Sequence, residues 1–252
     1  MRLPATPLHL LLQSYRLYRE QGAFYMGYAA WLLLPVAALF ALSFFPFEEN
    51  VAFILALLLS VAEGLLSLYI TIFLFLVTDK RLGHIEESHQ ELLLRSRTLL
   101  KPVILVALLQ AIVVLGGLIL FLIPGLIFLI WFSFAQIAVI LDRQRGFNAL
   151  AFSREAVRGR FWHAVWFVLA GPLFLFCGYA LLSSLVISLV ALLTQTDPST
   201  WTQTPIPLWI EALDAIAQTF LYPLLLIYFV LVYRLFTREC PPSTKETPSA
   251  TT

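Results

Sequence analysis

Every lysine and arginine of this chain falls into one of four clusters, and long apolar runs separate the clusters. The turns at 46–50, 124–125 and 194–207, which lie between alternate apolar runs, hold no basic residue. Short basic loops stay on the cytoplasmic side when a membrane protein inserts. The pattern therefore predicts an even number of membrane crossings, with both termini in the cytoplasm. The clusters are Arg2, Arg16 and Arg19; Lys80, Arg81, Arg95, Arg97 and Lys101; Arg143, Arg145, Arg154, Arg158 and Arg160; and Arg234, Arg238 and Lys245.

The composition supports the same conclusion. Hydrophobic residues make up 60% of the 252 residues and charged residues only 12%, whereas soluble proteins average roughly 25% charged. The segments on the basic side carry sixteen basic and nine acidic residues, a net charge of +7, and the opposite segments carry five acidic residues. Topology and anionic lipid explain this basic excess, so we expect no nucleic-acid partner.

Six apolar runs are long enough to cross about 30 Å of hydrocarbon, which takes about 20 residues. We therefore predict an all-α, polytopic protein with six transmembrane helices in one membrane domain, residues 1–238. The polar segment 239–252 is expected to be a disordered cytoplasmic tail. The predicted spans are 23–45, 51–77, 102–123, 125–141, 161–193 and 208–236.

The N-terminal segment has the pattern of an amphipathic helix. Thr6 and Pro7 form a typical helix start, and Leu8, Leu12 and Tyr15 follow helical spacing on one face. Two interpretations stay open. The helix lies in the inner membrane interface, or it continues the first span into the cytoplasm.

A Pro-Gly pair separates the third and fourth spans, within an apolar stretch from Phe121 to Leu126. Proline cannot donate a helical hydrogen bond, and glycine tolerates positive φ. We expect the pair to break the helix and to form a tight hairpin at the outer boundary of the membrane.

The two large inner loops resemble each other. The first begins with the sequence from Asp79 to Gly83 and the second with the sequence from Asp142 to Gly146, so each has an aspartate, basic residues and a glycine at matching spacing. Two parallel span–loop–span repeats would produce this pattern. Basic loop ends can also resemble each other through topology alone.

The stretch from Phe121 to Trp162 carries a family resemblance. Pro124-Gly125, an apolar helix, Asp142 and the run from Ala149 to Trp162 resemble the bacterial YciC-like group, which is similar to the membrane domain attached to some glycerophosphodiester phosphodiesterases. The segment from Ser14 to Arg19 extends the resemblance loosely toward the N-terminus. It implies an uncharacterised bacterial inner-membrane protein. The catalytic domain of the phosphodiesterase is absent, so its activity does not transfer.

The second inner loop offers candidate contacts for lipid headgroups. Arg154 and Arg158 share a helical face, and Arg160 and Trp162 place a cation and an aromatic ring at headgroup level. The alternative is that the helix is solvated, and that its basic residues only mark the cytoplasmic side of the membrane.

The second span has one polar face, with Ser60, Glu63 and Ser67 at helical spacing, and Gln110 and Gln136 are candidate partners for its carboxyl. We expect this face to point into the helix bundle. In one interpretation Glu63 lines a proton or solute path. In the other, Glu63 is protonated and joins helices through a neutral hydrogen bond.

No motif for catalysis or metal binding is present. We therefore expect a non-enzymatic protein without a cofactor, structural or lipid-associated through its basic cytoplasmic loops. The alternative is a small transporter or channel subunit that uses the polar face with Glu63. The expected location is the bacterial plasma membrane. The expected partners are membrane lipids, including anionic ones, and a second copy or another membrane protein.

Overall fold

The computed structural model describes residues 6–42, 44–45, 48–195 and 208–238. Helices connected by short turns make up this part of the chain, and it contains no strand. The helices are α1 (Pro7–Glu20), α2 (Gly22–Ala30), α3 (Leu33–Leu42), α4 (Glu49–Arg81), α5 (His89–Leu120), α6 (Leu122–Trp131), α7 (Ala135–Asp142), α8 (Phe147–Val157), α9 (Phe161–Thr194) and α10 (Leu208–Arg238).

Six helical segments in the described residues are long and apolar enough to cross a membrane, which confirms the predicted fold class. The predicted cytoplasmic tail, 239–252, lies outside the described residues. The six segments are Gly22–Leu39, Asn50–Arg81, His89–Leu120, Leu122–Asp142, Phe161–Thr194 and Ala212–Thr237.

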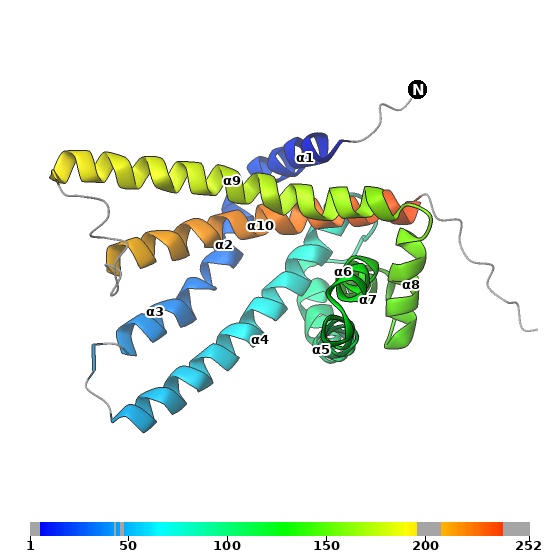
Figure 1. The fold of residues 1–252 in the computed structure, drawn as a ribbon, viewed down its shortest axis with the longest axis horizontal. Helices are drawn as coiled ribbons and strands as arrows, with labels where there is room; N and C mark the ends of the chain where they lie inside the picture. Colours follow the sequence, from blue (N-terminus) through cyan, green and yellow to red (C-terminus); the bar gives the residue numbers. More distant parts are fainter. Residues whose placement is uncertain (1–5, 43, 46–47, 196–207, 239–252) are drawn as a thin grey trace, which may run out of the picture.

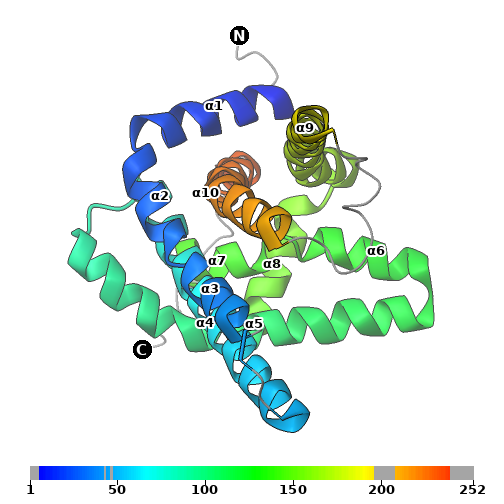
Figure 2. The same cartoon turned by 90° about the vertical axis from the view of Figure 1, so that its left-hand side faces the viewer.

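Three helical hairpins diverge from a common base (Figures 1 and 2). The first arm consists of α3, residues 33–42, and the outer part of α4, residues 49–69. The second arm consists of the end of α5 with α6, residues 107–131. The third arm consists of the outer parts of α9 and α10, residues 172–195 and 208–225. We call the remaining described residues the hub.

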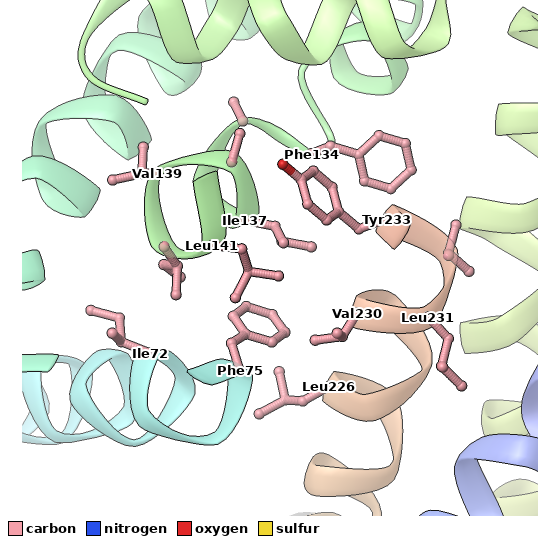
Figure 3. Packing of buried hydrophobic residues seen from close by; sticks show 14 of the residues in the cluster. Ile72, Phe75, Phe134, Ile137, Val139, Leu141, Leu226, Val230, Leu231 and Tyr233 are labelled. Atoms are coloured by element: carbon pink, nitrogen blue, oxygen red, sulfur yellow. The ribbon is translucent and has the colours of Figure 1, made fainter. Parts of the chain in front are cut away.

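The hub holds most of the buried side chains. On α4 the run from Ile72 to Asp79 is buried on every side, and the run from Ala138 to Leu141 on α7 is buried as well. Leu226, Val230 and Tyr233 bring α10 against both helices (Figure 3). A helix that is apolar and buried all round lies in the interior of its protein.

The arms have the opposite character. On the first arm the adjacent residues Leu57 and Leu58 are 54% and 60% exposed, and on the third arm Leu181 and Leu182 are 74% and 62% exposed. Adjacent helical positions point about 100° apart. Broad apolar faces are therefore left without protein neighbours, and in a bilayer lipid chains cover such faces.

The N-terminal amphipathic helix is present as α1. The Thr6 hydroxyl accepts a hydrogen bond from the His9 N–H at 3.3 Å, and Pro7 occupies the first turn. Leu10 and Ser14 are buried, whereas Leu8 and Leu12 are exposed on another face. The helix contacts α10 and α9, so it packs on the hub and keeps a second apolar face for other contacts.

Two predicted spans are not continuous helices. The first breaks at Trp31 and Leu32, between α2 and α3, and the fourth breaks at 132–134, between α6 and α7. Another difference concerns α5, which begins at His89 and so extends well before the predicted span start at 102.

The predicted tight hairpin between the third and fourth spans is present. The prediction that Pro124-Gly125 forms its break is wrong. The turn is at Phe121, which has φ −160° and ψ 146°, and both Pro124 and Gly125 lie in the first turns of α6. Proline is tolerated there because the first N–H groups of a helix have no intrahelical partner. Gly125 serves close packing instead, since a Cβ at Gly125 would collide with Leu118 of α5.

Candidate functional site

The break between α6 and α7 is held by a serine from a third helix. Ser153 of α8 is buried, and its hydroxyl donates to the Trp131 carbonyl at 2.7 Å and accepts from the Phe134 N–H at 3.1 Å. Non-helical backbone inside a membrane protein needs such partners. Ser153 therefore fixes α8 against the break and sets the position of the arginines that follow it.

A groove of about 350 Å³ lies between α6, α8 and the start of α9. We call it the α6–α8 groove. Its polar rim consists of Arg154 and Arg158, and its walls include Ile127, Trp131 and Phe161. The groove thus combines two cations with apolar walls.

Arg154 and Arg158 are held in different ways. The Arg154 guanidinium lies 4.7 Å from the centroid of the Trp131 ring, a cation–π contact that orients the cation without neutralising it. Arg158 is exposed and caps the end of α8, and Gly159 follows it with φ +80°, a common helix ending. Neither arginine forms an ion pair with a carboxylate in the part of the chain that the structure describes.

The structure separates Arg160 and Trp162 from the other two candidates. Arg160 donates to the Phe236 carbonyl at 3.3 Å and lies over the Phe236 ring at 5.3 Å, so it joins α9 to the end of α10. Trp162 is 78% exposed beside Phe161. Trp131 lines the groove but was not among the residues that the sequence singled out.

A charged cluster joins three helices within the hub, α4, α7 and α10. Arg234 of α10 donates to both carboxylate oxygens of Asp79, at 2.8 and 2.7 Å, and to Asp142 at 3.2 Å. Tyr233 donates to Asp142 as well. The exposed fractions of the side chains are 1% for Asp79, 16% for Arg234 and 28% for Asp142.

Each of the three charges comes from a helix of a different arm or its continuation: α4, α7 and α10. A bidentate arginine–carboxylate pair is among the stronger polar contacts in proteins. We call this cluster the hub latch. It holds the bases of the three arms together, although the arms separate farther out.

The clustering of charges did not predict the latch, although the positions of its residues in the sequence contain a signal for it. Asp79 and Asp142 open the two loops that resemble each other, and Arg234 lies inside the last apolar run, at 208–236. The aspartates that begin the two similar loops thus share one arginine.

The polar residues of α4 do not gather around the two glutamines. Gln136 donates to Gln110 at 3.3 Å, but in the described ranges no hydrogen bond or ion pair joins Glu63 to either of them. Ser60 is exposed, and Glu63 and Ser67 are partly exposed on the first arm. Glu63 thus lies on a hairpin that diverges from the helices carrying the glutamines.

No group of three histidine, cysteine, aspartate or glutamate side chains could hold a metal ion among the described residues. Comparison with known proteins adds no homologue: no protein-family profile, curated protein or solved structure matches this chain. Any assignment of function therefore rests on the groove and the charged cluster of this structure.

Proposed function

We propose that this chain is a non-enzymatic, lipid-associated protein of a bacterial inner membrane, with its hub on the cytoplasmic side and both termini there. The clustering of all basic residues on one side of the predicted spans supports the orientation. The resemblance to the YciC-like group supports the assignment to a bacterial membrane.

The observation that carries the proposal is the α6–α8 groove at the base of the splayed arms. Arg154 and Arg158 have no carboxylate partner in the described residues, and the apolar walls of the groove adjoin Leu126 and Ile123, which are 51% and 71% exposed. Basic pockets on the cytoplasmic side of membrane helices bind anionic headgroups. A headgroup phosphate would meet the two arginines while its acyl chains lie along α6.

The transport alternative has weaker support. A path through the protein would need Glu63 to face a polar cavity. Three grooves lie around the hub, and each is lined by arginines together with apolar and other polar side chains, including Glu86 and Glu87 in one of them. Glu63 lines none of the three. A scaffold whose outer surface binds lipid fits this arrangement better.

Native mass spectrometry of the purified protein tests the proposal with phosphatidylglycerol, which is anionic, and phosphatidylcholine, which is zwitterionic. We expect bound phosphatidylglycerol on the wild type, and affinity about tenfold lower in the R154Q/R158Q variant. The matched control is R97Q/K101Q, which removes two exposed inner-side cations that lie outside the groove.

Equal binding of both lipids, or an equal loss in the control and the groove variant, would contradict the proposal. Proton or solute flux in liposomes that disappears in the E63Q variant would favour the transporter instead.

A further inference from the structure

A second groove lies on another side of the hub, between α5 and the loop that follows α7. Its volume is about 290 Å³. The rim carries Arg143, Arg145 and Thr98, and the floor includes Leu99, Pro102 and Val139. We call it the α5–α7 groove. None of these residues was a candidate contact at the level of sequence.

The charges on this rim are only partly neutralised. Arg95 is 14% exposed and is held by Glu87 at 2.8 Å and by the Ile140 carbonyl at 3.4 Å. Arg143 is 73% exposed, and its one carboxylate contact is the same Glu87 at 3.5 Å. Arg145 is exposed, and its side chain has no carboxylate partner among the residues described. Two arginines therefore share one carboxylate, and the third has none.

The backbone presents Arg143 and Arg145 outward. Arg143 ends α7 with φ 55°, a left-handed conformation that is uncommon for a residue with a side chain. Gly146 follows with φ 52° and begins α8. This short connection turns the chain from α7 into α8 and leaves both arginines exposed at the mouth of the groove rather than in the buried core.

The floor of the groove continues into an exposed apolar stripe. Thr98, Leu105 and Ile112 lie seven residues apart on α5, so they share one helical face. Leu105 is 52% exposed and Ile112 is 60% exposed. A ligand with an anionic head at Arg143 and Arg145 could therefore extend an apolar chain outward along α5.

We infer that the α5–α7 groove is a second binding site for an anionic phospholipid, with the phosphate at Arg143 and Arg145 and an acyl chain along Leu105 and Ile112. The inference extends the proposed function to a different site. It gives the second inner loop two lipid sites: Arg143 and Arg145 at its start, directly after Asp142, and Arg154 and Arg158 further along, on and at the end of α8. Positive charge at the membrane surface attracts anionic headgroups, and the apolar stripe selects a lipid over a free phosphate.

The test is lipid titration by native mass spectrometry with phosphatidylglycerol, comparing R143Q/R145Q with the control R16Q/R19Q, which removes two exposed cations of α1 that line neither groove. Arg143 and Arg145 are exposed, so their loss leaves the hub packing intact. We expect R143Q/R145Q to lose one bound lipid through an affinity about tenfold lower, and the control to keep it. The combined variant with R154Q/R158Q should lose both lipids.

A third variant, E87Q, is expected to strengthen lipid binding rather than weaken it. Glu87 partly neutralises Arg143, so E87Q should raise the affinity for phosphatidylglycerol, whereas a purely structural role of Glu87 predicts no gain. Unchanged lipid binding in R143Q/R145Q, alongside a loss in R154Q/R158Q, would overturn this inference and leave the proposed function standing. No loss in either variant would overturn both. Displacement of the lipid by soluble glycerol phosphate at equal concentration would show a phosphate site without lipid selectivity, which also contradicts the inference.

Discussion

The hub and the arms share the apolar helices α4, α9 and α10, yet these helices pack differently in the two regions. In the hub, Leu74 and Ile227 have no exposed surface, and the latch supplies charged contacts between helices. In the arms, Leu185 and Phe53 are more than half exposed although they lie on the same helices or their hairpin partners. Apolarity alone does not draw helices together in lipid, because lipid tails are as apolar as leucine. Specific polar contacts and close approach decide where the helices meet.

The largest expected effect comes from breaking the latch. Arg234→Ala leaves Asp79 buried without its cation, and removal of one partner of a buried pair costs about 3–5 kcal/mol. Asp79→Asn should cost more than Asp142→Asn, because Asp79 is 1% exposed and bound through both oxygens. Reversible unfolding in mixed micelles measures the free energy of unfolding.

Arg97→Ala is the matched control for this prediction, since Arg97 is an exposed cation on the same side of the protein. If Arg234→Ala lowers the free energy of unfolding no more than Arg97→Ala does, the latch does not hold the hub together.

A smaller effect compares two glycines of α9, one in the hub and one in the third arm. Tyr228 lies against Gly171, where a Cβ would collide with the ring, and its hydroxyl donates to the Phe167 carbonyl at 2.6 Å. Overpacking of this kind costs about 1–3 kcal/mol. Gly171→Ala should therefore destabilise the protein in the same unfolding experiment.

Gly178 has open space around the position of a Cβ. Gly178→Ala should leave stability unchanged or raise it by up to about 1 kcal/mol, because alanine favours the helix more than glycine does. If Gly171→Ala and Gly178→Ala lower the free energy of unfolding equally, α9 is packed along its whole length.

The features that depend on local sequence pattern could be predicted. The six apolar segments and the capped start of α1 at Thr6 follow from composition and spacing, and the structure contains them. The break at 132–134 could not be predicted, because the apolar run through it is continuous and the residue that stabilises it, Ser153, lies on another helix.

The latch was missed for a related reason. Asp79 and Asp142 are 155 and 92 residues from Arg234 along the chain, and charges at span ends are expected from topology alone. The pairing of Gln110 with Gln136 joins two residues named from the sequence, but the expectation that the polar face of α4 points into the bundle assumed a compact bundle. The diverging arms leave Ser60 exposed instead.

The most direct test of the account is the oxygen accessibility of nitroxide labels in reconstituted membranes. Labels at Leu57, Leu58, Leu181 and Leu182, with Leu74 as the buried reference, should be placed one at a time in a chain whose Cys177 and Cys240 are replaced by serine. If the arms diverge, oxygen accessibility should be high at all four arm positions and low at Leu74, because lipid covers both adjacent faces of each arm helix. If one member of each adjacent pair is as protected as Leu74, the arms pack into a closed bundle and do not diverge in the membrane.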